Sequence, residues 1–138
     1  MRVFKLVAVA LPLLLAVSAC DSVIDNIPTT PDPVTVTETF TGSLNINGAA
    51  THTFFTSATG AVTATLTSLG DNPPAQVGFS VGTFAGSSCS LLITNDKAVV
   101  TSVVTGVVTT LGGSLCVRIY DVGSLTESVP YEIRVEHK

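Results

Sequence analysis

The sequence predicts an all-β fold, an antiparallel sandwich of two sheets with about eight short strands and a jelly-roll-like arrangement. Three observations predict it. Apolar and polar residues alternate along several short segments, turn-forming residues separate these segments, and no helical periodicity competes. Valine and threonine dominate the segments, and their branched side chains favour a pleated sheet over a helix. Many short strands with such turns are typical of sandwiches.

The strand pattern is clearest near the C-terminus, where Tyr131, Ile133 and Val135 alternate with charged residues. This is the pattern of a strand with one buried face. The expected strands are 34–42, 51–58, 61–69, 76–84, 88–94, 98–108, 115–122 and 130–138. The residues between them favour turns, among them NING at 45–48, NDK at 95–97 and DVGS at 121–124. The apolar run VVTSVVTGVV at 99–108 is expected to form a central strand covered on both faces.

The N-terminal segment has the three zones of a secretory signal. Arg2 and Lys5 are basic, residues 6–17 are apolar, and two small residues stand just before Cys20. The apolar zone, about a dozen residues, is shorter than the roughly 20 that a membrane-spanning helix needs. We therefore expect residues 1–19 to be removed as a signal peptide, residues 20–33 to form a proline-containing tether, and residues 34–138 to form the sandwich domain.

The four residues VSAC at 17–20 resemble a bacterial lipobox. The resemblance implies that Cys20 becomes a new N-terminus carrying a diacylglycerol thioether and an acyl chain on its amino group. Two or three acyl chains are enough for stable anchoring. The implied location is the bacterial cell envelope, with the domain facing the periplasm or the cell surface. An ordinary signal peptide with a cysteine near the cut is the alternative.

The charge of the mature chain limits its partners. Removal of residues 1–19 leaves 119 residues, enough for one domain, with four basic residues against ten acidic ones and a formal net charge of −6. Such an acidic surface argues against binding nucleic acid or docking electrostatically on anionic lipid. The expected membrane contact is therefore the covalent lipid anchor.

If Cys20 carries lipid, Cys89 and Cys116 remain as an even pair in a compartment that permits disulfides. A bridge between them would close a loop of about 28 residues, which stabilises the fold by about 3.5 kcal/mol in the chain-entropy model. Free buried thiols are the alternative. Metal ligation lacks the close C-x-x-C or Cys/His spacing of zinc sites.

Two long segments resemble the bacterial pre-peptidase C-terminal domain family. They are GGSLCVRIYDVGSLTESVPYEIRVEH at 112–137, with a glycine-led strand and a tyrosine-led final strand, and ETFTGSLNINGAATHTFFTSATGAVTATL at 38–66. The sequence departs from the family pattern at Cys116, where an aromatic or aliphatic residue is more frequent. The resemblance implies a jelly-roll-like sandwich, found in that family as an accessory module of secreted enzymes and similar to carbohydrate-binding folds.

A G-x-S-x-G motif at 78–82 raises a hydrolase alternative, with Ser80 as nucleophile, Asp96 or Asp121 as acid and His137 as base. Such a serine needs a sharp turn from strand into helix, whereas here the strand alternation continues through the motif. Ser80 is therefore expected to be an outward strand residue. His52 and His137 are both expected at the surface.

The sequence has residues suited to two kinds of binding site. Loop acids at Asp71, Asp96 and Asp121 could converge on calcium at one end of the sandwich, but each is equally a turn former. A glycan site would need an exposed aromatic platform. There is no tryptophan, most of the phenylalanines and tyrosines are expected in the core, and one of Phe54 and Phe55 must face outward.

The expected function is that of a non-catalytic interaction module, lipid-anchored in the envelope, which binds a protein or a glycan through loops at one end of the sandwich. No cofactor is expected apart from the covalent lipid, and the oligomeric state is left open. The alternatives are a purely structural envelope lipoprotein and a serine hydrolase that uses Ser80.

Overall fold

The computed structural model describes residues 30–138, of which Asp32–Lys138 form one compact unit. Within this part of the chain no helix is long and apolar enough to cross a membrane. The eight strands, in chain order, are β1 (Val36–Leu44), β2 (Ala49–Thr56), β3 (Gly60–Ser68), β4 (Val77–Ala85), β5 (Ser88–Ala98), β6 (Val103–Val108), β7 (Gly113–Tyr120) and β8 (Val129–His137). The expected all-β fold is confirmed.

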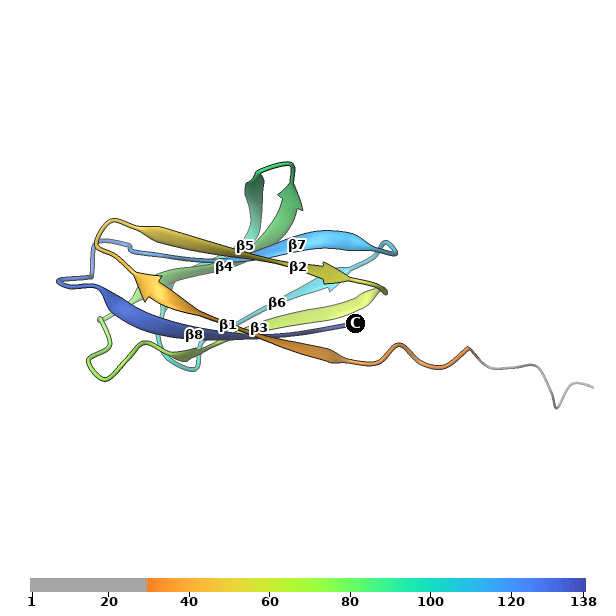
Figure 1. Cartoon of the computed structure of the whole chain (residues 1–138), viewed down its shortest axis with the longest axis horizontal. Coiled ribbons are helices and arrows are strands. Elements are labelled where there is room, and N and C mark those ends of the chain that lie inside the picture. The colour runs from red at the N-terminus through yellow and green to blue at the C-terminus, as the bar shows by residue number, and fades with distance from the viewer. Residues whose placement is uncertain (1–29) are drawn as a thin grey trace, which may run out of the picture. The chain divides into compact units, whose positions relative to one another are not determined.

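The strands form two four-stranded antiparallel sheets that pack face to face (Figure 1). Sheet 1 has the order β1-β8-β3-β6 and sheet 2 the order β2-β7-β4-β5. Every connection except the β4–β5 hairpin passes from one sheet to the other, which is the connectivity of a jelly roll. β1 and β6 are the edge strands of sheet 1, and β2 and β5 are the edge strands of sheet 2. β1 lies next to β2 at one side of the sandwich, and β6 lies next to β5 at the other.

The core lies between the two sheets and is built by alternation along the strands. Every second residue of β3, β7 and β8 faces inward, and its neighbours face out. Each large apolar side chain buried in this way stabilises the fold by about 1.5–3 kcal/mol. The core side chains include Leu44, Val62, Leu66, Phe79, Val117, Ile119, Ile133 and Val135, all fully buried.

The turn expected at residues 95–97 is wrong, as is the single strand expected at 98–108. β5 runs through residues 95–97, and a register shift against β4 accommodates an extra residue there. The side chain of Asn95 does make a turn-like bond, accepting from the amide of Lys97 at 3.0 Å, but the chain stays in the strand. The reversal lies at 99–102, where Thr101 has φ 77° and the amide of Ser102 donates to the carbonyl of Val99 at 2.9 Å.

The run at 99–108 does not form a central strand covered on both faces. Its strand part, β6, is an edge strand that pairs only with β3. Val104 points into the core, whereas Val103 and Val107 lie on the outer face with exposed fractions of 52% and 73%. The expectation failed because an apolar run fits both a doubly covered strand and an edge strand whose outer face is uncovered.

Candidate functional site

The outer face of sheet 2 carries a concavity of about 440 Å³. The strand register places Tyr120 and Arg118 of β7 on this face, because Tyr120 pairs with Gly78 and Arg118 with Ser80, opposite to the core side chains of β4. The site is lined by Asn47, Gly48, Ala49, Leu91, Arg118, Tyr120 and Asp121. We call this concavity the Tyr120 cradle.

The ring of Tyr120 lies flat over the backbone of β4. A Cβ atom added at Gly78 would come within 2.1 Å of the ring atom Cε2 and within 2.2 Å of Cζ. The Tyr120 hydroxyl donates a hydrogen bond to Asp96 Oδ1 on β5, so the side chain spans from β7 across β4 to β5. Burial, this hydrogen bond and the charge of Asp96 raise the pKa of Tyr120 to about 12. The Tyr120 side chain is therefore neutral, with its ring against Gly78 and its hydroxyl bonded to Asp96.

Arg118 lies two residues before Tyr120 on the same face. Its Nε is buried and has no hydrogen-bond partner. The ion pairs found in residues 30–138 are Arg134 with Glu136 and His137 with Glu38, so no carboxylate of this region pairs with Arg118. The cradle thus holds a cation that the described chain does not neutralise.

One wall of the cradle is the β4–β5 hairpin, which rises from its sheet in Figure 1. β5 and β7 are separated by β4, and flat neighbouring strands would place them about 9.6 Å apart. The Cα atoms of Cys89 and Cys116 are only 5.9 Å apart, and their sulfurs are 2.06 Å apart. The hairpin is therefore folded over the outer face, where this pair of cysteines at disulfide distance ties it to β7.

Gly82 permits this fold. A Cβ atom there would come within 2.1 Å of the carbonyl oxygen of Ser90, so the two strands approach too closely for any side chain. The register between β4 and β5 also shifts at this point. Leu91, which pairs with Gly82, consequently faces the cradle.

Asp121 forms the rim. Its Oδ1 accepts from the amides of Gly123, Ser124 and Leu125 at 2.8, 2.9 and 3.2 Å, and its Oδ2 accepts from the amide of Asn47 at 2.9 Å. These bonds, with that from Asn47 the largest, lower the pKa of Asp121. The carboxylate thereby joins the β1–β2 turn to the loop after β7.

The three aspartates considered as calcium ligands lie in different elements, and Asp96 and Asp121 have different hydrogen-bond partners. Asp71 is exposed in the loop after β3, Asp96 lies in β5 rather than in a loop, and Asp121 is bonded to backbone amides. Among residues 30–138 no group of three or more His, Cys, Asp or Glu side chains is placed to hold a metal ion.

The hydrolase residues also have separate partners. Ser80 lies in the middle of β4 rather than at a turn into a helix, and its hydroxyl donates to the carbonyl of Arg118 at 3.5 Å. It is on the outer face, as expected, but fully buried rather than solvent-facing. In the part of the chain that the structure describes, no hydrogen bond joins any two of Ser80, Asp96, Asp121 and His137.

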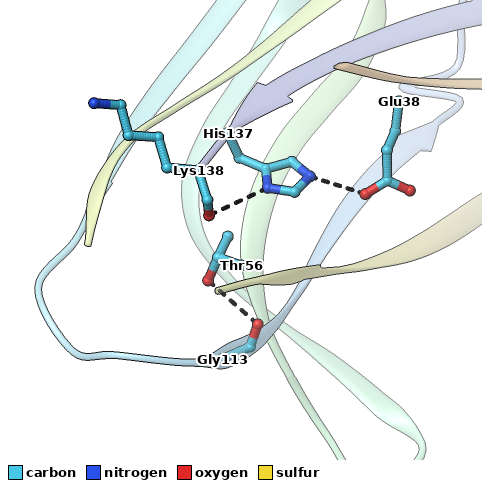
Figure 2. A network of polar contacts seen from close by, with 5 residues as sticks. All are labelled: Glu38, Thr56, Gly113, His137 and Lys138. Carbon is cyan, nitrogen blue, oxygen red and sulfur yellow. Dashed lines mark hydrogen bonds and ion pairs between the residues drawn. The ribbon is translucent and has the colours of Figure 1, made fainter. Parts of the chain in front are cut away.

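The expectation that both histidines lie at the surface is wrong. His137 has an exposed fraction of 3%, and its Nε2 lies 2.9 Å from Glu38 Oε1, as Figure 2 shows. β8 pairs with β1 as far as His137, and the carbonyl of Lys138 accepts from the amide of Ser57 at 3.1 Å. Both contacts hold the last residues of β8 against the sheets.

His52 is half-buried on the inner face of β2. Its Nε2 lies 2.8 Å from the Tyr131 hydroxyl, and its ring stacks on Phe40 with centroids 4.9 Å apart. Burial lowers its pKa. Both histidines fill the space between β1 and β2, the edge strands of the two sheets on that side.

Phe54 is buried and Phe55 is 60% exposed, so the expectation that one of this pair faces outward is confirmed. Sequence reasoning missed Tyr120, which was not singled out from the tyrosines expected in the core. The available signal was that Tyr120 follows Cys116 and Arg118 at even spacing, opposite in phase to the apolar Leu115, Val117 and Ile119.

Cys20 and the expected signal peptide, residues 1–19, lie outside the described residues, whereas residues 30–33 are exposed and have no regular structure. No protein-family model matches this chain, and no curated protein matches it either. The assignment of a function therefore depends on the residues and the geometry described above.

Proposed function

We propose that this protein is a non-catalytic, lipid-anchored module of the bacterial cell envelope that binds a glycan in the Tyr120 cradle. The observation that carries the proposal is the position of Tyr120, whose ring lies flat on Gly78 with its hydroxyl bonded to Asp96. One face of the ring is against the backbone of β4, and the other is directed away from it.

A flat, immobile aromatic ring suits a sugar. The C–H face of a pyranose packs against such a ring, and the sugar hydroxyls need polar groups close by. Arg118 and Asn47 provide polar side chains at the same concavity. Because the ring is already fixed by Asp96, little side-chain entropy is lost when a ligand binds.

The lipid anchor is proposed from the lipobox-like residues before Cys20, and the tether at 20–33 contains Pro28, Pro31 and Pro33. Proline-rich segments are extended at about 3.1 Å per residue, so the tether reaches at most about 40 Å. Such a spacer would hold a binding domain clear of the lipid headgroups.

A glycan array probed with the full-length lipidated chain in detergent tests the binding proposal. We expect the unaltered chain to bind and Tyr120→Ala to lose at least tenfold in affinity. Phe55→Ala is the matched control, since it removes an exposed aromatic on the same sheet that does not line the cradle. Equal binding by Tyr120→Ala and the unaltered chain would place the site elsewhere and contradict the proposal.

The anchor and the absence of catalysis need separate tests. Cys20→Ser should abolish incorporation of a labelled fatty acid, and normal labelling of that variant would refute the lipobox. A serine-reactive phosphonate probe should leave Ser80 unlabelled in the folded chain. Labelling of Ser80 that disappears on denaturation would instead identify a hydrolase.

A further inference from the structure

We infer that the ligand of the Tyr120 cradle carries a carboxylate, so that the glycan class it takes is an acidic one such as a uronic-acid polymer. This inference rests on the proposed function, because it specifies the ligand of the same site. It depends on a different residue, Arg118.

The Arg118 guanidinium lacks a partner at a place where a partner is expected. Its Nε is buried from solvent and makes no hydrogen bond. Buried donors in folded proteins are nearly always paired, and an unpaired one on a charged group is costly. Arg118 lies among the residues that line the cradle, and of its guanidinium nitrogens only Nε is buried and unpaired. A ligand in the cradle can therefore bind the terminal nitrogens and neutralise the charge.

The nearby carboxylates are already engaged. Asp121 accepts four backbone amides, and Asp96 accepts the Tyr120 hydroxyl. Neither forms an ion pair with Arg118 in residues 30–138. The cradle therefore holds a cation whose charge a carboxylate of the ligand can neutralise.

The geometry suits one acidic sugar unit. Arg118 and Tyr120 are two residues apart on β7 and face the same way, which separates their Cα atoms by about 6.6 Å. A guanidinium binds a carboxylate through two parallel N–H···O bonds, and the adjacent ring packs against the sugar that bears it. The two side chains thus divide the recognition of a uronate between charge and stacking.

The test compares an oligogalacturonide with its fully methyl-esterified form, within a panel of acidic and neutral glycans, by titration against the full-length chain in detergent. We expect the free acid to bind about 10- to 100-fold more tightly than the ester, as a charged hydrogen-bonded pair predicts. Arg118→Gln should remove this preference, and Arg118→Lys should retain part of it. Arg134→Gln is the matched control, because Arg134 is exposed on sheet 1 and already paired with Glu136; it should change nothing.

The other outcomes are separable. Equal binding of acid and ester that is lost in Tyr120→Ala would overturn the carboxylate inference and leave the glycan function standing. An acidic peptide is titrated in the same way, and its binding through Arg118 with no glycan bound would overturn the glycan function. No binding across the whole panel by a chain shown to be folded by circular dichroism would overturn both.

Discussion

The ring of Tyr120 occupies the space into which a side chain at Gly78 would project, with Cε2 of the ring 2.1 Å from the position of a Cβ atom. These residues are direct partners across β7 and β4. A glycine on one strand therefore determines how the tyrosine on the next one lies. The ring can reach Asp96 on β5 only because nothing stands between them at residue 78.

Gly78→Ala should consequently displace the Tyr120 ring. We expect a loss of about 1–3 kcal/mol in the free energy of unfolding, the usual cost of overpacking, together with weaker glycan binding. Urea denaturation and ligand titration measure the two effects. Gly113→Ala is the control, because a Cβ atom at Gly113 would meet its nearest neighbour at an ordinary 3.8 Å. If both variants behaved alike, the ring would not depend on Gly78.

The contact between Cys89 and Cys116 gives a second prediction. The double variant Cys89→Ala with Cys116→Ala should lose about 3.5 kcal/mol of stability and should also bind ligand more weakly, because the hairpin wall is no longer held over the cradle. Reductant should reproduce both effects in the unaltered chain. Intact mass after alkylation should show two further thiols only once reductant is added, and alkylation of both without reductant would disprove the bridge.

Stability should fall as the solution becomes acidic, in part through His52. Burial lowers the pKa of His52 in the folded chain, so the unfolded chain binds its proton more readily. The folded state is therefore penalised as pH falls below the ordinary histidine value of about 6.5 and through the lower folded pKa. Urea denaturation between pH 7.5 and 5 should show this decline. His52→Gln should flatten it, and an unchanged slope in that variant would exclude His52 as a source.

The Glu38 carboxylate holds the almost fully buried His137, so its removal should be destabilising. Glu38→Ala leaves a buried nitrogen without its partner, and we expect a loss of about 1–3 kcal/mol in the free energy of unfolding. Glu136→Ala removes a carboxylate whose partner, Arg134, is exposed, so the loss should be at most about 1 kcal/mol. Equal losses in the two variants would show that the contact between Glu38 and His137 contributes no more to stability than the exposed ion pair.

The strands could be predicted because alternation of apolar and polar residues within one segment is enough to identify a strand with one buried face. Residues 61–69 and 130–138, for example, form β3 and β8 within one residue. What alternation does not report is which strand lies beside which. For that reason Val103 to Val108 were expected in the centre of a sheet and lie at its edge. Asn95 to Lys97 were expected in a turn because these residue types favour turns, but they lie in β5, where a register shift against β4 accommodates the extra residue.

The candidate site was harder to predict because the pairing of residues between strands brings its side chains together, and alternation does not reveal that pairing. Tyr120, Gly78 and Asp96 come from three strands, and only the pairing of β7, β4 and β5 brings them together. The position of the hairpin over the sheet depends in turn on Gly82 and on the contact between Cys89 and Cys116. The cysteine pair was expected from its count alone, but the wall that it secures was not.

The uncovered edge strand β6 gives the last prediction. Val107 is exposed on a strand without charge, proline or bulge, and such edges pair readily with other chains. Val107→Lys should slow concentration-dependent aggregation, followed by light scattering, and should change stability by no more than about 0.5 kcal/mol. Val34→Lys is the matched control, since it adds the same charge at a valine that is 79% exposed but outside every strand. Each lysine reduces the net negative charge of the chain, so an effect of net charge alone would speed aggregation in both variants. Slowing by Val107→Lys but not by Val34→Lys would identify the β6 edge as the surface through which chains associate, and equal rates in the two variants would contradict this.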